Sequence, residues 1–385
     1  MKKLRLNEPS VTLKMRAYVS EVFDTTWLAC RGDFSKRFEK AFAEFVDVPF
    51  AKAVNTGTAA LQIALMTRGL PKGSLVVIPS YTCSAIGQAV KGAGLVPVVV
   101  DVERDTFGMD VRLLKRAILE YDISAVILVH LYGTPAKDTL AIDSLCDRNS
   151  IFLVNDCSEA HGAKIRKSGE MHSIARIGGV ATFSCRAEKL VGSCEAGVIV
   201  SFDEELIKQA DIIADRGRVA KGLWDKYFTN VEGNNWLLSN LVSAVALAAV
   251  EDVQKHLHRR RCIAELYRRE AESIGLTEFG YFQSPSDYLS DDSVYAVAWL
   301  NCFVLKDGGR SAESIGLALI EKGIECRPGF YPIETLAPTE ARHVLCTGEA
   351  DFLWRNIVCL PSSPSLTEDD VRCACFELAS ECRRA

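Results

Sequence analysis

The stretch Ala181-Thr-Phe-Ser-Cys-Arg-Ala-Glu-Lys189-Leu-Val-Gly-Ser-Cys-Glu-Ala-Gly197 carries a lysine between two apolar runs. A short apolar run precedes the lysine and Val198-Ile-Val200 follows it, a pattern that predicts strand, loop and strand with Lys189 in the loop. A lysine held between buried strands can form a Schiff base with a carbonyl cofactor if its amine is partly desolvated. The ordinary alternative is a solvated loop lysine without a chemical role.

An aspartate upstream strengthens the chemical interpretation. In Ile151-Phe-Leu-Val-Asn-Asp156 an apolar run ends in an acidic residue. The carboxyl ends of strands are where an open α/β sheet carries its ligand-binding groups. A lysine that binds an aldehyde and a carboxylate that holds a pyridinium nitrogen are the two parts that a pyridoxal 5'-phosphate (PLP) site needs. Lys189 and Asp156 therefore predict a PLP site.

Continuous apolar runs alternate with helical stretches in the same half of the chain. Runs without polar alternation are typical of a parallel sheet that helices cover on both faces. We therefore predict an α/β fold of three layers around a mostly parallel sheet. The strands are expected in the runs Leu75–Pro79, Val96–Asp101, Ala125–Val129 and Ile151–Val154.

The remaining segments predict how the chain divides. Residues 16–46 look helical, the polar segment 164–176 predicts an exposed loop, and residues 239–275 predict one long helix. The last part predicts a smaller α+β domain with strand-like segments at 294–305 and 324–328 and helices at 311–322 and 367–382. The predicted division is a large domain over 1–238, a connecting helix over 239–275 and a small domain over 276–385.

Composition and charge exclude several classes of function. The chain has 385 residues, a length suited to two domains, and a net charge of −5 with basic residues spread throughout, which favours neither nucleic acid nor anionic membrane as a partner. The N-terminus starts like a signal peptide, but no apolar stretch of the needed length follows, and no run reaches the roughly 18 apolar residues of a membrane span. The 14 cysteines lack zinc-finger spacing, so we expect free thiols, no metal and a cytoplasmic location.

Two other segments suggest cofactor contacts. Residues 53–65 predict a short strand, a turn at Gly57 and a helix that starts at Thr58. Backbone N–H groups and a hydroxyl at such a helix start form a phosphate cradle, although a plain capped helix also explains the pattern. Tyr81 follows a strand, where it could stack on a flat cofactor ring or simply be a half-buried aromatic residue.

Taken together, the motifs resemble the DegT/DnrJ/EryC1/StrS family of PLP-dependent sugar aminotransferases, which have the aspartate-aminotransferase fold (fold type I). The resemblance runs from about residue 27 to residue 380, and its specificity lies in the order and spacing of the motifs. The motifs are Asn-Thr-Gly-Thr-Ala-Ala-Leu (55–61), Pro-Ser-Tyr-Thr (79–82), Val-His-Leu-Tyr-Gly (129–133), Asn-Asp-Cys-Ser-Glu-Ala-His-Gly-Ala (155–163), Phe-Ser-Cys-Arg-Ala-Glu-Lys (183–189), Gly-Asn-Asn-Trp (233–236) and Gly-Ile-Glu-Cys-Arg-Pro (323–328).

The resemblance implies roles around the cofactor ring. Lys189 would carry PLP as a Schiff base and later move the proton, and Asp156 would pair with the pyridinium nitrogen. Tyr81 would stack on the ring. Glu159 stands where the family has Gln or Glu near the ring hydroxyl.

The resemblance also implies how the phosphate is held. Gly57, Thr58 and Ser184 would bind it, and Asn235 would reach the phosphate of the neighbouring subunit. That last contact implies a homodimer with shared active sites.

For function, the resemblance implies transamination. An amino acid, L-glutamate, would load the cofactor, and a nucleotide-linked keto-sugar would accept the amine in amino-sugar, O-antigen or natural-product biosynthesis. A 4-keto-6-deoxy sugar is the expected acceptor, while the sugar, its nucleotide and the choice of C3 or C4 stay open. The candidates for substrate contact are His161, Arg327 and the stretch 217–236.

Some positions depart from the family pattern and keep alternatives open. Cys194 and Ala196 stand where glycines are usual, and Leu237 stands where arginine is frequent. The alternatives are an aminotransferase for a non-sugar ketone such as a cyclitol and a non-catalytic, regulatory family member. Dehydratases of the family replace the lysine by histidine, so Lys189 argues against that activity. Cys157 and Cys185 are interpreted as packing residues.

Overall fold

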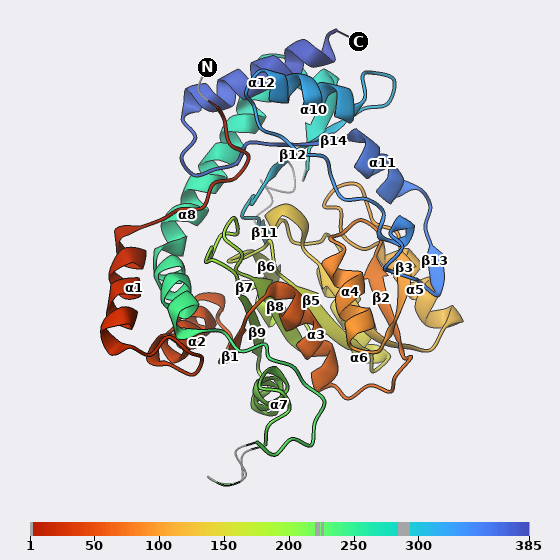
Figure 1. Cartoon of the computed structure of the whole chain (residues 1–385). Coiled ribbons are helices and arrows are strands. Elements are labelled where there is room, and N and C mark those ends of the chain that lie inside the picture. The colour runs from red at the N-terminus through yellow and green to blue at the C-terminus, as the bar shows by residue number, and fades with distance from the viewer. Residues whose placement is uncertain (1–2, 220–223, 225–226, 284–292, 385) are drawn as a thin grey trace.

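An eight-stranded sheet forms the centre of the molecule (Figure 1), in the strand order β1-β9-β8-β5-β4-β2-β3-β13. The computed structural model describes residues 3–219, 224, 227–283 and 293–384. All pairs in this sheet are parallel except β1 with β9 and β8 with β9, which confirms the mostly parallel α/β prediction. The strands are β1 (Phe50–Val54), β2 (Leu75–Pro79), β3 (Val96–Val100), β4 (Ile123–Val129), β5 (Phe152–Asp156), β8 (Val180–Ser184), β9 (Gly197–Ser201) and β13 (His343–Leu345).

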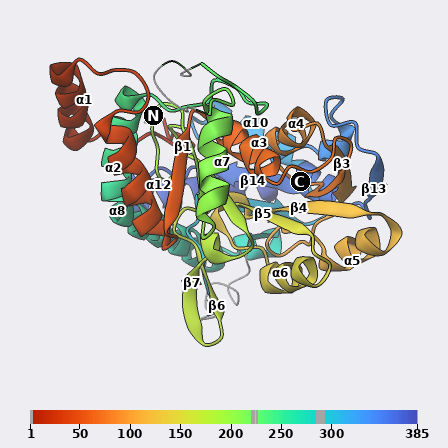
Figure 2. The ribbon, with the colours of Figure 1, turned by 90° about the horizontal axis from the view of Figure 1, so that it is seen from below.

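Helices cover both faces of this sheet, and this explains the continuous apolar runs. In β2, Val76 and Ile78 pack into one hydrophobic core and Val77 packs into another on the opposite face. Figure 2 shows α3 and α4 on one side of the strands and α5 and α6 on the other. The helices are α3 (Gly57–Thr67), α4 (Ala85–Gly92), α5 (Val111–Glu120), α6 (Thr139–Arg148) and α7 (Glu204–Ala214).

The helical stretch predicted at 16–46 is confirmed, and the structure divides it between two helices, α1 (Leu13–Thr25) and α2 (Asp33–Val46). Thr26 ends α1 in the left-handed region with φ 57°, and the side-chain amide of Asn240 donates to Trp27 O at 2.8 Å. The break is therefore set partly by a residue more than 200 positions away, which helical periodicity cannot reveal.

The segment predicted as an exposed loop at 164–176 is a β-hairpin. Strands β6 (Lys164–Lys167) and β7 (Glu170–Ser173) pair antiparallel, and β11 (Val294–Tyr295) adds a third strand. Ser168 and Gly169 both have positive φ, 54° and 88°, as a two-residue type I′ hairpin turn requires. The dipeptide Ser168-Gly169 is the sequence signal from which this hairpin turn could have been predicted.

The C-terminal part packs around its own hydrophobic core. The long helix is confirmed as α8 (Asn240–Ser273), and the last helix begins with a capping box between Thr367 and Asp370. The expected strand at 324–328 is wrong, because only isolated bridges form there, from Ile324 to Leu4 and from Arg327 to Cys359. The elements of this part are α8, β10 (Gly280–Phe282), β12 (Asn301–Leu305), α10 (Ala312–Glu321), α11 (Glu349–Asn356), β14 (Ile357–Leu360), α12 (Glu368–Cys382) and the short 3-10 helices η3 (Leu276–Glu278) and η4 (Ile333–Thr335). Two further 3-10 helices, η1 (Leu131–Gly133) and η2 (Ile174–Arg176), precede α8 in the chain.

Two connections cross the predicted domain divisions. Leu4, near the N-terminus, belongs to the C-terminal core, and β13, from the last third of the chain, pairs with β3 of the large sheet. The boundaries at 238 and 275 stay a prediction. No helix within the described ranges combines the length and apolar character needed to cross a membrane, and all 14 cysteines are free thiols.

Candidate active site

A pocket of about 310 Å³ lies where the carboxyl ends of β4, β5 and β8 meet the N-terminus of α3. Parallel strands bring these ends to one edge of the sheet, as the sequence predicted. Residues that are far apart in the sequence share its wall: Gly57, Thr58, Asp156, Glu159, Ser184, Lys189, Trp299, Arg327 and Phe330. The pocket therefore brings together seven of the predicted site residues, namely Gly57, Thr58, Asp156, Glu159, Ser184, Lys189 and Arg327.

Lys189 lies in this pocket with its amine in a nearly closed environment. Its Nζ is 2.9 Å from Glu159 Oε1 and 3.6 Å from the centre of the Trp299 ring, and its side chain is 10% exposed. Trp299 is itself fixed, because its Nε1 donates to Glu188 O at 2.8 Å and its backbone N donates to Tyr132 O at 2.8 Å. The partial desolvation that Schiff-base chemistry needs is present. The sequence carried no signal for Trp299.

Glu159 connects the lysine to the turn after β4. Its Oε1 contacts Lys189 while its Oε2 accepts a hydrogen bond from Tyr132 N at 2.8 Å. Tyr132 adopts φ 56°, a left-handed conformation that is uncommon for a large residue. Its backbone N–H and C=O are both engaged, by Glu159 and Trp299, so the surrounding contacts hold the strained residue in place.

Asp156, the last residue of β5, is a buried acid. Its pKa is raised to about 6, mainly by burial and also by the nearby Glu159 carboxylate, while a hydrogen bond from Ser158 N to Oδ1 at 3.0 Å opposes the shift. A carboxylate in this position is poorly compensated and would gain from a cationic partner. The protonated nitrogen of a pyridine ring is such a partner.

The start of α3 forms a cradle for an anionic group. A Cβ on Gly57 would lie 2.6 Å from Ser184 Cβ, so only glycine allows the helix to approach β8 this closely. Beside it, Thr82 Oγ1 is buried and lacks a hydrogen-bond partner within the described residues. Free backbone N–H groups at a helix start and nearby hydroxyls suit a phosphate. The residues present therefore fit PLP at both its ring nitrogen and its phosphate.

Three predicted residues do not line this pocket: Tyr81, His161 and Asn235. Tyr81 is fully buried, with its hydroxyl 3.2 Å from Tyr132 Oη and its ring edge-on to Phe107. Cys83, two residues later, lines the pocket instead and is exposed. His161 is completely buried with its ring against those of Phe42 and Phe183, and burial lowers its pKa to about 3 and leaves it neutral.

Asn235 also lies outside the pocket of its own chain. It is exposed and forms an isolated bridge with Asp215. Residues 220–223 and 225–226 of the stretch 217–236 lie outside the described residues. Cys157 and Cys185 are completely buried, in keeping with a packing role.

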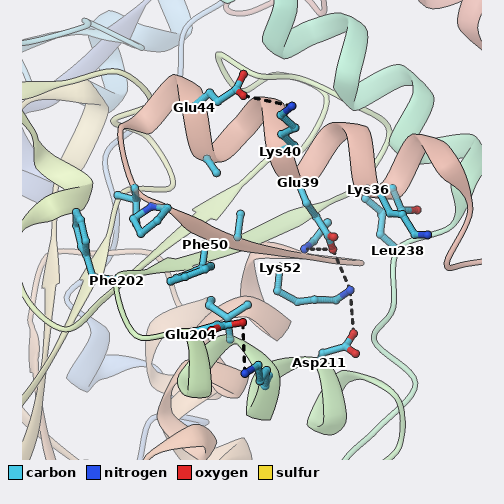
Figure 3. Close-up of a pocket in the computed structure, with 18 of the residues that line it drawn as sticks. Lys36, Glu39, Lys40, Glu44, Phe50, Lys52, Phe202, Glu204, Asp211 and Leu238 are labelled. Atoms are coloured by element: carbon cyan, nitrogen blue, oxygen red, sulfur yellow. Dashed lines mark hydrogen bonds and ion pairs between the residues drawn. The ribbon is translucent and has the colours of Figure 1, made fainter.

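A larger hollow lies elsewhere, between α2, β1 and α7 (Figure 3), with a volume of about 1170 Å³. Its buried amine, Lys52 Nζ, is 2.9 Å from both Glu39 Oε1 and Asp211 Oδ1. Burial lowers the pKa of Lys52, but the two carboxylates outweigh it and raise the pKa overall. Lys52 is therefore a protonated amine whose charge is compensated by two carboxylates, and the three side chains form a structural ion-pair cluster. The smaller pocket is therefore the candidate active site.

Known proteins share this fold along nearly the whole chain. The crystal structure of a DegT DnrJ EryC1 StrS aminotransferase from Brucella abortus matches it with a TM-score of 0.84 at 24% identity, over 95% of each chain. The likeness places the chain in fold type I, and the family model together with curated relatives shows the class, PLP-dependent aminotransferases. The chain belongs to the DegT/DnrJ/EryC1/StrS aminotransferase family, whose model matches residues 10–378.

Two curated relatives bear on the reaction. The GDP-perosamine synthase of Escherichia coli O157:H7 is 30% identical over 375 residues, which is 97% of each chain. The L-glutamine:2-deoxy-scyllo-inosose aminotransferase of Micromonospora echinospora is 32% identical over 250 residues, covering 63% of this chain and 58% of that protein. The predicted family, enzyme class and cofactor are confirmed.

Proposed function

We propose that this enzyme transfers an amino group from L-glutamate to a nucleotide-linked keto-sugar, a 4-keto-6-deoxy sugar, in amino-sugar biosynthesis. The observation that carries the proposal is the position of Lys189 Nζ, 2.9 Å from Glu159 and in one pocket with Asp156 and the start of α3. The name of the relative that covers 97% of the chain, GDP-perosamine synthase, supports a nucleotide-linked sugar as the acceptor.

Each residue of the pocket then has a task. Asp156 holds the proton on the ring nitrogen by charge pairing, and Gly57, Thr58 and Ser184 bind the phosphate. When bound, PLP supplies an electron sink for the substrate carbon that loses its proton. Lys189 holds the cofactor and moves that proton, and Glu159 orients the lysine amine through its 2.9 Å contact.

We further propose that Asn235 contacts the phosphate in a neighbouring subunit, so that the enzyme is a homodimer with shared sites. What supports this is that Asn235 is exposed and absent from the pocket of its own chain. Mixing Lys189→Ala with Asn235→Ala subunits should restore about a quarter of the wild-type sites, because half of the dimers are mixed and each mixed dimer holds one intact site. No restored activity would contradict sharing.

The 14 free thiols favour the reducing cytoplasm as the location.

The first test is the visible spectrum of the PLP-loaded enzyme beside Lys189→Ala. The expected result is a yellow absorption band in the wild type that the variant lacks and that L-glutamate bleaches. A wild type without the band would overturn the assignment of Lys189 and favour a non-catalytic protein. A band that glutamate leaves unchanged would overturn glutamate as the donor and would call for L-glutamine and other amino acids.

The acceptor needs a separate test. The glutamate-loaded enzyme should regain its yellow band when a nucleotide-linked 4-keto-6-deoxy sugar is added, and the matching 3-keto sugar should act more slowly. Recovery with a cyclitol ketone alone would replace the sugar as the proposed acceptor.

A further inference from the structure

A second pocket, of about 560 Å³, adjoins the candidate active site. The two pockets share Glu188, Trp299 and Arg327 as lining residues. The outer pocket thus adjoins the inner one at Trp299, and its lining contains no residue from the start of α3. A substrate whose reacting part is held near Lys189 would extend its remaining part into this space.

The N-terminal segment forms one wall of the outer pocket and is firmly held. Leu4 pairs with residues on both sides of Ile324, Leu6 N donates to Glu325 Oε2 at 3.1 Å, and Leu6 O accepts from Ser362 N at 2.7 Å. Asn7 Nδ2 donates to Glu188 O at 2.7 Å, which ties the segment to the loop that carries Lys189. This segment therefore belongs to the architecture of the site, although it lies more than 180 residues from the lysine.

Two arginines of the outer pocket lack a carboxylate partner. Arg327 lies 5.4 Å from the Trp299 ring centre and 5.8 Å from that of Phe330, and Arg5 is exposed. Within the described part of the chain, neither guanidinium forms an ion pair. A ring face leaves the N–H edge of a guanidinium able to bind two oxygens of an anion.

The carboxylates in the outer pocket have other contacts. Glu325 accepts from Leu6 N, Glu188 Oε2 lies 3.6 Å from Arg186 Nε, and Glu8 Oε2 accepts from Ser365 Oγ at 3.2 Å. Glu188 is thus paired with a cation and Glu325 and Glu8 are held by neutral donors, while Arg5 and Arg327 are the two arginines that line the outer pocket and could meet an anion.

We propose that the outer pocket binds the diphosphate of the nucleotide-linked substrate through Arg5 and Arg327, with the nucleoside beyond it. The inference rests on the proposed function, because a sugar held near Lys189 carries its diphosphate outward. A diphosphate has enough charge and oxygen atoms to engage two guanidinium groups at once. The N-terminal segment is then a substrate-binding wall.

The test measures binding to the PLP-loaded enzyme by calorimetry, with GDP, UDP and dTDP as probes and L-glutamate as the comparison. Arg5→Gln and Arg327→Lys should each raise the Kd of the best nucleoside diphosphate by about tenfold or more, and high salt should reduce the difference. The Kd of glutamate should stay unchanged in Arg5→Gln. The control is Arg16→Gln, which removes an exposed arginine outside both pockets and should change nothing.

The outcomes separate this inference from the function beneath it. If the wild type binds a nucleoside diphosphate and both arginine variants bind it equally well, the outer pocket is not its site, while the proposed acceptor stands. If no nucleoside diphosphate binds the wild type, both the assignment of the outer pocket and the proposed nucleotide-linked acceptor are wrong. Weaker glutamate binding in Arg5→Gln, with unchanged nucleotide binding, would assign the pocket to the donor and overturn the proposal. Thermal melting of each variant verifies that it is folded.

Discussion

Lys189 Nζ and Glu159 Oε1 form an ion pair of 2.9 Å in which the two side chains are only 10% and 9% exposed. Breaking one side of such a pair leaves a buried charge without its partner. In the protein without cofactor, Lys189→Met and Glu159→Gln should therefore each lower the free energy of unfolding, and the double variant should lose less than the sum. The expected coupling is about 1–3 kcal/mol, measured by urea denaturation.

An exposed pair supplies the control for this cycle. Arg355 and Asp351 lie on α11 with 66% and 52% of their side chains exposed, and their coupling should stay below about 0.5 kcal/mol. Equal coupling in the two pairs would show that burial does not strengthen the contact of Lys189 with Glu159.

Asp156 should make the stability of the cofactor-free protein depend on pH. Its pKa is raised to about 6, so the folded protein binds this proton more tightly than the unfolded chain does. The free energy of unfolding therefore falls as pH rises from about 4 to 6, by on the order of 3 kcal/mol. Asp156→Asn removes the stability lost when the buried carboxyl ionises, so the variant should stabilise the cofactor-free protein at neutral pH.

The same variant should behave in the opposite way with PLP. Asparagine cannot compensate a protonated ring nitrogen by charge, so PLP should raise the melting temperature of Asp156→Asn less than that of the wild type, and activity should fall by at least about a hundredfold. A variant that gains no stability without PLP would show that Asp156 is not the destabilised acid described above.

Gly57 should tolerate no side chain without loss of cofactor affinity. A Cβ would lie 2.6 Å from Ser184 Cβ and 3.0 Å from its Cα, so α3 would have to move away from β8. Gly57→Ala should raise the Kd for PLP by about tenfold or more, the equivalent of a packing strain of 1–3 kcal/mol, in a fluorescence titration. The control is Gly316→Ala in α10, whose Cβ would meet only Cys326 Sγ, at 3.6 Å. Equal Kd values for PLP in Gly57→Ala and Gly316→Ala would contradict the role of the start of α3 as the phosphate cradle.

Cys83 should be protected by PLP. Its thiol lines the pocket, whereas the Tyr81 ring is buried behind it. Without PLP, iodoacetamide should modify Cys83, and PLP should reduce that modification several-fold by covering the thiol. Peptide mass spectrometry measures it, with the exposed Cys373 on α12 as an internal control that PLP leaves unchanged.

Tyr81→Phe tests the predicted stacking of Tyr81 on the PLP ring. It removes the hydroxyl that lies 3.2 Å from Tyr132 Oη, which should cost about 1 kcal/mol of stability and leave the visible band in place. A shifted band in this variant, with Cys83 unprotected by PLP, would support the stacking role predicted for Tyr81.

Side-chain direction limited how much of the site could be predicted. Lys189 and Asp156 were predicted to lie together because Asp156 ends one continuous apolar strand and Lys189 lies in the loop after another, and parallel strands place such residues at one edge. Tyr81 and His161 were expected to contact cofactor or substrate, yet both side chains point into packed surroundings. In the irregular segments after a strand, no periodicity indicates which residue faces the pocket, and the structure places Cys83 rather than Tyr81 in the pocket wall.

The sequence by itself determined the parallel sheet, the long helix α8 and the capped last helix, because all of these follow from local periodicity and capping signals, and it carried the motifs on which the family resemblance rests. Only the tertiary structure decided that Trp299 covers the lysine amine, that the N-terminal segment forms the outer pocket and that β13 joins the large sheet. The physical reason is the range of the interactions. Local patterns come from neighbours along the chain, whereas these contacts join residues more than 100 positions apart, whose pairing depends on packing of the whole chain.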